Sequence, residues 1–199
     1  MTTPNRIQPL AALFALAFLA ACSDAPPRGS EAASEPVPVI SRTAPVGDLQ
    51  AAVALGVPYA HEPRPGLLTS GQISPAQMDA LARAGYTTFI SLRLPTEEGA
   101  GWEEAYTGRN GLTFARIPVD GPAGLTRENA EALDRILDAV GDAKTALYCG
   151  SANRVGALLA MRAHWLDAAT PEEAVAVGRA AGMTRLEPDV AKLLGLAAP

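Results

Sequence analysis

The segment from Thr145 to Leu158, TALYCGSANRVGAL, combines the residue types that an anion-binding nucleophile needs. An apolar strand pattern leads into Cys149, small residues follow, and Arg154 begins a helical pattern. Small side chains let consecutive backbone N–H groups point inward around an anion, and the helix adds its positive N-terminal end. The arginine supplies a planar fork that binds two phosphate oxygens at once. The same positive field favours the thiolate form of the cysteine, which is the nucleophilic form.

The pattern therefore predicts that Cys149 is a nucleophile. Its expected anion-binding loop comprises Gly150, Ser151, Ala152, Asn153 and Arg154. We expect Ser151 to hydrogen-bond the thiolate and Asn153 to brace the loop through its amide. The alternative is that Cys149 is a small buried hydrophobic residue, which is the common role of a lone cysteine.

A second candidate is Asp120, which lies 29 residues before Cys149 at the end of the strand pattern LTFARIPV. It begins a Gly/Pro loop, DGPAGL, that could close over a site. Hydrolysis of a phosphate ester needs a proton donor for the departing alkoxide, worth roughly 10²- to 10⁴-fold in rate. Asp120 could serve as that acid, or it could only shape the turn before Gly121. Arg93, at the end of another strand pattern, could help to bind an anion or could form a surface salt bridge.

These residues depend on a regular alternation of strand and helix patterns. Strands are expected at 67–69, 86–92, 112–119 and 145–148. Helices are expected at 74–84, 126–140, 154–168 and 187–196, and a further helix is expected to begin at 170. Residues 97–107 are expected to form a short helix or an ordered loop. Such alternation predicts an α/β fold with a parallel-rich central sheet flanked by helices. Ligand sites in such folds lie at the carboxyl ends of the strands. Cys149 and Asp120 each follow such an end.

The beginning of the chain has the pattern of an export signal. Residues 10–21 form an unbroken apolar run, too short to span a bilayer but of the length found in signal peptides. The run ends in Leu-Ala-Ala-Cys22, which resembles the bacterial lipobox, so residues 1–21 are expected to be removed and Cys22 to be lipidated. Residues 22–57, rich in Pro, Ala, Ser and Glu, are then a flexible tether, with one or two helical turns at 48–55. The folded domain is expected at 58–199, facing the periplasm from the membrane of the cell envelope, with the outer membrane favoured by Ser23.

Composition narrows the function. The chain has 199 residues, 48% of them hydrophobic and 19% charged, as in a globular domain. The net charge of −5 argues against nucleic-acid binding, because no basic surface is available to neutralise phosphates. Two Cys and two His, one Cys lost to lipidation, are too few for a structural zinc site or a disulfide scaffold. We therefore expect no metal and no cofactor, and a monomer whose partners are the membrane and a phosphorylated substrate or another small anion.

The sequence resembles the bacterial DUF442 group. This group is the phosphatase-like domain of the beta-lactamase-hydrolase-like proteins, and it is related to dual-specificity and tyrosine phosphatases. The resemblance rests on TSGQIS at 69–74, the strand at 89–93, Ile-Pro-Val at 117–119, and CGSANRVGAL. It covers about residues 67–194 and implies a cysteine-phosphatase fold. It further implies that Cys149 forms a phosphocysteine, that Arg154 binds the phosphoryl group, and that Asp120 is the general acid. The leading interpretation is therefore hydrolysis of a phosphoprotein or a small phosphate ester.

Three departures from the phosphatase signature, His-Cys-x5-Arg followed by Ser or Thr, leave other chemistry open. Here the loop is Cys-x4-Arg, Tyr148 replaces the histidine, and Val155 replaces the hydroxyl residue. A six-residue loop is also the length found in rhodaneses, which carry a persulfide on a cysteine. The alternatives are thus a sulfurtransferase with a persulfide on Cys149, and an inactive module that binds anions.

Overall fold

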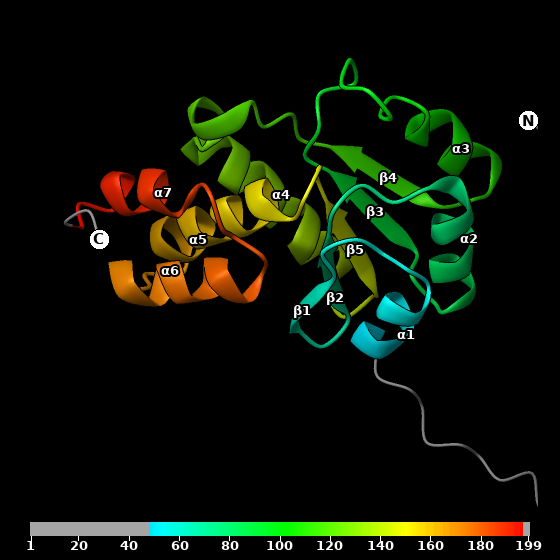
Figure 1. Cartoon of the computed structure of the whole chain (residues 1–199), viewed down its shortest axis with the longest axis horizontal. Helices are drawn as coiled ribbons and strands as arrows, with labels where there is room; N and C mark the ends of the chain where they lie inside the picture. The colour runs from blue at the N-terminus through cyan, green and yellow to red at the C-terminus, as the bar shows by residue number, and fades with distance from the viewer. Residues whose placement is uncertain (1–47, 197–199) are drawn as a thin grey trace, which may run out of the picture. The chain divides into compact units, whose positions relative to one another are not determined.

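The computed structural model describes residues 48–196 and shows a mixed α/β architecture (Figure 1). The expected signal peptide, the lipidation at Cys22 and the tether as far as residue 47 lie outside the described residues. The five strands are β1 (His61–Arg64), β2 (Leu67–Ser70), β3 (Thr88–Ser91), β4 (Thr113–Arg116) and β5 (Thr145–Tyr148). They form one sheet in the order β1-β2-β5-β3-β4. All neighbours are parallel except β1 and β2, which confirms the expected parallel-rich sheet.

The edge strand β1 was not expected from the sequence. Its four residues, HEPR, lack the apolar or alternating pattern of a buried strand. Pro63 is tolerated because an edge strand does not need every N–H for the ladder. Antiparallel pairing with β2 thus adds a strand that no local pattern marks.

Three of the helices begin where a local side chain caps them. The helices are α1 (Asp48–Ala54), α2 (Pro75–Arg83), α3 (Glu103–Arg109), α4 (Arg127–Val140), α5 (Asn153–Leu166), α6 (Pro171–Ala180) and α7 (Glu187–Leu193), with a 3₁₀ turn η1 (Gly121–Gly124). Ser74 and Thr170 form capping boxes, and Thr126 accepts a hydrogen bond from the third residue of α4. The expected starts of α2, α4 and α6 are therefore confirmed. None of the helices in residues 48–196 is long and apolar enough to cross a membrane.

The folded body begins earlier than the sequence suggested. Helix α1 confirms the expected helical turns, but it packs into the body: Ala52 is fully buried and Val57 nearly so. Lys144 Nζ donates to the carboxylate of Asp48 over 2.6 Å. The expected tether boundary at residue 57 is therefore wrong, because the apolar residues of 48–57 have a core to pack against.

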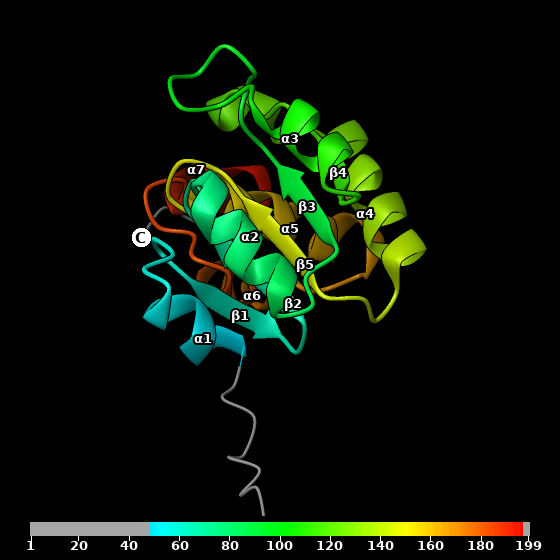
Figure 2. The ribbon, with the colours of Figure 1, turned by 90° about the vertical axis from the view of Figure 1, so that its right-hand side faces the viewer.

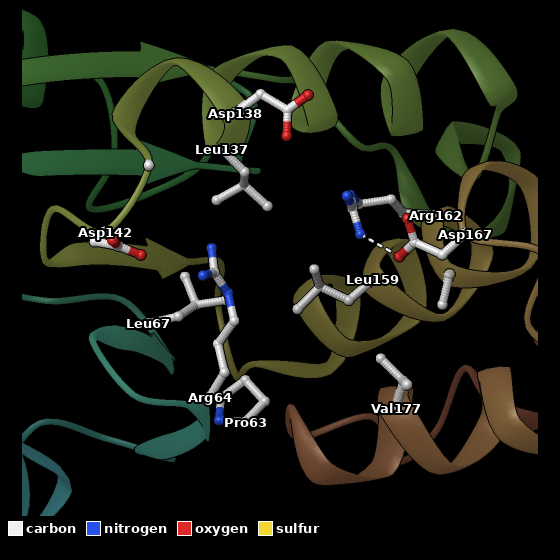
Figure 3. Close-up of a pocket in the computed structure, with 12 residues that line it drawn as sticks. Pro63, Arg64, Leu67, Leu137, Asp138, Asp142, Leu159, Arg162, Asp167 and Val177 are labelled. Carbon is white, nitrogen blue, oxygen red and sulfur yellow. Dashed lines mark hydrogen bonds and ion pairs between the residues drawn. The ribbon is translucent and has the colours of Figure 1, made fainter.

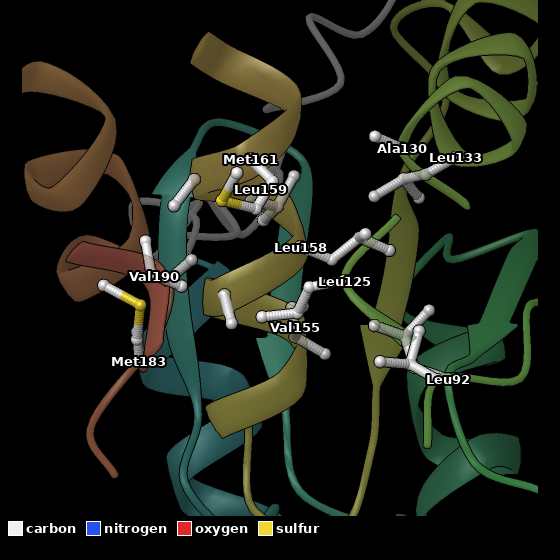
Figure 4. Packing of buried hydrophobic residues seen from close by; sticks show 14 of the residues in the cluster. Leu92, Leu125, Ala130, Leu133, Val155, Leu158, Leu159, Met161, Met183 and Val190 are labelled. Atoms are coloured by element: carbon white, nitrogen blue, oxygen red, sulfur yellow. The ribbon is translucent and has the colours of Figure 1, made fainter. Parts of the chain in front are cut away.

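Each face of the sheet carries its own hydrophobic core. Leu147 and Cys149 point into a core formed with α4, α5, α6 and α7, part of which Figure 4 shows. Ala146 and Tyr148 point the other way, into a core formed with α1, α2 and α3. Figure 2 shows α2 on one side of β5 and α5 on the other. The alternation along β5 therefore directs Cys149 toward the α4–α5 side.

Candidate active site

Cys149 follows β5, a strand in the interior of the sheet, at its carboxyl end. Its N–H donates to the Ser70 carbonyl over 3.2 Å, and the preceding carbonyl, of Tyr148, accepts from Leu92 N–H over 2.8 Å. Hydrogen bonds to β2 and to the residue after β3 thus fix the point where the chain leaves the sheet. The side chain of Cys149 is buried. The predicted placement of this cysteine at the carboxyl edge of the sheet is what the structure shows.

The loop after Cys149 runs close to neighbouring backbone. Ser151 forms an isolated antiparallel bridge with Gly71, and a Cβ on Gly71 would lie 3.0 Å from the Gly150 carbonyl oxygen. A side chain at Gly71 would therefore push against the loop, which would have to shift by a few tenths of an ångström. Ala152 turns the chain into α5 with a left-handed φ of 61°. This conformation costs an alanine about 1–2 kcal/mol and lets only four residues separate the cysteine from the arginine.

The start of α5 has no side-chain cap. The first backbone bond inside the helix runs from Gly156 N–H to the Ala152 carbonyl, so the N–H groups of residues 153–155 have no acceptor within the helix. Asn153 does not cap them, because its side-chain oxygen accepts from the N–H groups of Thr184 and Leu186, at 2.8 and 3.1 Å. Asn153 therefore braces the turn between α6 and α7, whereas the sequence suggested that it would brace the cysteine loop.

Arg154 is held by a carboxylate that the sequence did not single out. Its Nη1 and Nη2 donate to the two carboxylate oxygens of Glu97, each over 2.7 Å, and Nη1 also donates to the Val119 carbonyl over 3.0 Å. Its Nη2 would lie 3.6 Å from a Cβ on Gly150, so the guanidinium folds over the small residues of the loop. The hydrogen bonds from Arg154, together with those from Arg93, lower the pKa of Glu97 to about 2. The pKa of Arg154 is raised, first by Glu97 and then by the charge of nearby Cys149, although burial acts in the opposite direction.

Arg93 supports this pair and does not face the loop as a free anion ligand. Its three nitrogens donate to Glu97 over 2.9 Å, to the Gln72 side chain over 2.8 Å and to the Glu98 carbonyl over 2.7 Å. Of the two roles expected for Arg93, the structure favours the salt bridge, in a nearly buried setting. Glu97 therefore joins two arginines from different elements.

Asp120 lies at the rim of the same arrangement. It directly follows Val119, whose carbonyl accepts from Arg154, and its side chain is exposed. The turn η1 begins immediately after it, yet its carboxylate makes no capping hydrogen bond there. Gly124 folds back so tightly that a Cβ would lie 2.8 Å from the Val119 Cα. The backbone thus shapes the turn, and the carboxylate of Asp120 has no part in capping it.

Tyr148, where phosphatases carry a histidine, faces away from the thiol. It is fully buried, and its hydroxyl has no hydrogen-bond partner among the described residues. Its pKa is raised, mainly by burial and next by the charge of Glu103. That carboxylate is itself buried and is bonded by Arg116 over 2.9 Å. A buried charge network therefore lies under the site on the α3 side of the sheet.

Sequence reasoning missed Glu97, Gln72 and the pair of Glu103 with Arg116. The available signal for Glu97 was its position in the loop after β3, four residues beyond Arg93, at the sheet edge that also carries Cys149. A carboxylate beside two arginines at one edge is a strong electrostatic pairing.

One cavity of the described part lies away from this chemistry. It has a volume of about 500 Å³ and is lined by residues that include Leu67, Leu137, Arg64 and Arg162 (Figure 3). Leu67 begins β2 and pairs with Thr145, the first residue of β5. This cavity is therefore at the amino ends of the strands, at the opposite edge from Cys149.

Comparison with known proteins identifies the fold. No family model matches the sequence, and no curated protein matches it. A solved DUF442 protein of Shewanella putrefaciens CN-32 is 23% identical over 59% of this chain and 75% of its own, with a TM-score of 0.50. A candidate phosphatase of Neisseria meningitidis Z2491 is 19% identical over 66% and 96%, and Tk-PTP is 17% identical over 69% and 96%, each with a TM-score of 0.53.

These likenesses agree with the resemblance seen in the sequence and concern the fold. The described residues therefore have the fold of the DUF442 and tyrosine-phosphatase-like proteins.

Proposed function

We propose that the protein hydrolyses phosphate monoesters with Cys149 as the nucleophile. The proposal rests on one observation, namely which N–H donors of Arg154 are already hydrogen-bonded and which are left for a ligand. An arginine has five N–H donors, and Glu97 and Val119 take three of them. The two that remain, on Nε and on the outer side of Nη2, lie along one edge of the guanidinium and form a fork for two phosphate oxygens. With the uncapped start of α5, this fork gives an anion site beside the thiol.

In the first step the Cys149 thiolate attacks phosphorus. The S–P bond forms as the bond from phosphorus to the ester oxygen breaks, and the departing alkoxide takes a proton from Asp120. In the second step the Asp120 carboxylate takes a proton from water, whose oxygen attacks phosphorus. The S–P bond then breaks, which releases inorganic phosphate and regenerates the thiolate.

Glu97 and Arg93 contribute by holding Arg154 in place before substrate arrives. A donor that is already oriented needs no reorganisation as charge builds on the phosphoryl oxygens. Because Glu97 binds both ends of the guanidinium, the arginine can rotate little about its long side chain. Glu97 and Arg93 are positioning residues in this mechanism.

The test is a pair of assays on the purified protein and on Cys149→Ser. We expect the protein to release phosphate from an aryl phosphate and the variant to lose about 10³-fold or more of that turnover. Equal turnover by the two proteins would exclude the covalent mechanism. Circular dichroism of the variant checks that the buried site tolerates the oxygen.

Sulfur transfer is a second candidate, favoured by the length of the loop. Four residues between cysteine and arginine, with Ala152 in a left-handed turn, close a tighter ring than the phosphatase signature. In this reaction thiosulfate would transfer its outer sulfur to Cys149, giving a persulfide and sulfite, and cyanide would remove it as thiocyanate. Thiocyanate formation that needs Cys149, without phosphate release, would assign the protein to this class. If neither phosphate release nor thiocyanate formation is detected, the result would favour the inactive module that binds anions.

A further inference from the structure

A second cavity, of about 490 Å³, lies beside the Gly71 turn, which is bridged to the cysteine loop. Nine residues line it, and we call it the Trp102 pocket: Gly56, Pro58, Gln72, Ile73, Ser74, Pro75, Gln77, Gly99 and Trp102. They come from the segment before β1, the turn between β2 and α2 with the first residues of α2, and the loop between β3 and α3. Three separate stretches of chain therefore converge there.

Gly71 connects the lining of the pocket to the cysteine loop. The Pro58 carbonyl accepts from the Gly71 N–H over 2.8 Å, and Gly71 is bridged to Ser151 of the loop. The next residue, Gln72, lines the pocket and accepts from Arg93 over 2.8 Å. Arg93 in turn holds Glu97, the partner of Arg154. A substrate whose phosphoryl group lies in the loop would thus have the pocket beside it.

The lining of the pocket carries no charge, and its polar side chains are already engaged. Gln72 Nε2 donates to the Ile73 carbonyl and to Glu103, and Gln77 Nε2 donates to the Gly56 carbonyl over 2.8 Å. Ser74 is occupied in capping α2. The surface left for a ligand consists mainly of proline rings, backbone and an indole.

Trp102 is fixed in its position. Its indole N–H donates to the Gly99 carbonyl over 3.2 Å, and its ring meets the edge of Tyr106 with centroids 5.3 Å apart. Tyr59, beside Pro58, is 63% exposed on a left-handed backbone with φ of 51°. A rigid indole with an exposed tyrosine nearby suits an apolar or aromatic group.

We propose that the Trp102 pocket binds the leaving group of the substrate and that this group is uncharged and apolar or aromatic. This inference rests on the proposed function. Arg93, the other guanidinium near the loop, is nearly buried, does not line the pocket and donates to Glu97, Gln72 and Glu98. A second phosphate in the pocket would meet no cation in its lining. The substrates are therefore monoesters with an apolar alcohol, and polyphosphorylated molecules are disfavoured.

The kinetic test compares 2-naphthyl phosphate with phenyl phosphate, whose leaving groups have similar acidity but different size. Trp102→Ala should raise KM for the naphthyl ester about tenfold, with little change in kcat and a smaller change for the phenyl ester. Trp102→Phe should keep most of the preference, and Trp165→Phe, which changes the other tryptophan, should keep all of it. Inhibition by inorganic phosphate should be the same in every variant. An unchanged ratio of the two KM values in Trp102→Ala would overturn the proposal.

A binding measurement separates this proposal from the proposed function. Saturation-transfer NMR on the unmodified protein and on Cys149→Ser should detect 2-naphthol, which carries no phosphate, and Trp102→Ala should lose the signal. Binding that depends on Trp102 without phosphate release would retain the pocket and reject the phosphatase. Phosphate release that depends on Cys149 without binding of 2-naphthol would do the reverse.

Discussion

Glu97 connects more of the site than any residue chosen from the sequence. Its carboxylate accepts from Arg154 on one side and from Arg93 on the other, and also from the Leu94 N–H over 2.8 Å. These bonds stabilise the charged form, which explains why its pKa is lowered to about 2. The same bonds should therefore contribute both to catalysis and to the pH dependence of stability.

The pH dependence gives the first prediction. A carboxylate with a lowered pKa in the folded state stabilises the fold fully above its unfolded pKa of about 4.3, and this contribution is lost as the pH falls toward 2. Glu97→Gln should therefore be less stable than the parent at pH 6, and the difference in unfolding free energy should shrink between about pH 5 and 2. Urea unfolding at a series of pH values measures it. Glu98→Gln is the control, because the Glu98 carboxylate forms no ion pair among the described residues. A difference that stays constant with pH would contradict the assignment.

Asp120 gives a second prediction at this scale. If its carboxyl protonates the leaving oxygen, Asp120→Asn should lower kcat/KM by roughly 10²- to 10⁴-fold for an alkyl phosphate, whose alkoxide leaves with difficulty. The loss should be far smaller for 4-nitrophenyl phosphate, whose phenolate leaves without a proton. The parameter kcat/KM is the correct measure because it reports the steps up to the first irreversible one. Equal losses on both esters would remove Asp120 from the acid role.

The residues of the site differ in how far the sequence could predict them. Cys149 and Arg154 lie in one short segment, so their roles follow from local order. Glu97 was missed because its bond to Arg154 spans 57 positions and depends on how the loop after β3 folds over the sheet edge. The sequence does not mark Trp102 as a pocket residue, since nothing in its own segment indicates that Pro58 and Gln72 line the same pocket.

At the scale of elements, α5 carries the loop and depends on close packing against α6. A Cβ on Gly156 would lie 2.4 Å from the Met183 nitrogen and 2.5 Å from the Gly178 carbonyl oxygen. Both are backbone atoms, so the helix would have to move. This close approach explains why α5 carries glycine at a position where helix propensity favours other residues.

Gly156→Ala should therefore destabilise the protein by about 1–3 kcal/mol, because overpacking shifts α5 away from α6. Its proposed turnover should fall as well, since the start of α5 moves with the helix. Gly108→Ala is the matched control: Gly108 lies in α3, and a Cβ there would meet nothing within 4 Å. Removing a glycine from a helix should stabilise the protein by up to about 1 kcal/mol. Thermal unfolding of both variants tests the contrast, and similar melting temperatures for the two would refute it.

Elements were predictable where the signal is local. Ser74, Thr126 and Thr170 mark helix starts by bonds that reach only three residues ahead. The strand β1 escaped prediction because it is short, polar and interrupted by Pro63, and pairing with β2 alone defines it. The extent of the folded body was also beyond local patterns. Residues 48–57 resemble the Pro- and Ala-rich stretch before them, and only the core shows that Ala52 and Val57 are buried.

At the scale of the whole molecule, that boundary gives the last prediction. Ala52 and Val57 belong to the core on the α2 side of the sheet, which also contains Met78 and Tyr148. The N–H of Leu49 donates to Glu62 over 3.2 Å, so α1 is also tied to β1. A chain of residues 58–199 would lose these contacts and expose the core, whereas residues 48–199 would keep them.

We expect the shorter chain to be less stable by about 2–4 kcal/mol, since burial of one Val side chain alone is worth about 1.5–3 kcal/mol. Because Pro58 would become its first residue, the contact of Pro58 with Gly71 beside the Trp102 pocket should also loosen. KM for 2-naphthyl phosphate should then rise more than KM for phenyl phosphate. Thermal unfolding and the two KM values, measured on both chains, test this. Equal melting temperatures would mean that α1 is not part of the cooperative fold. A lower melting temperature with an unchanged KM ratio would mean that α1 stabilises the body without shaping the pocket.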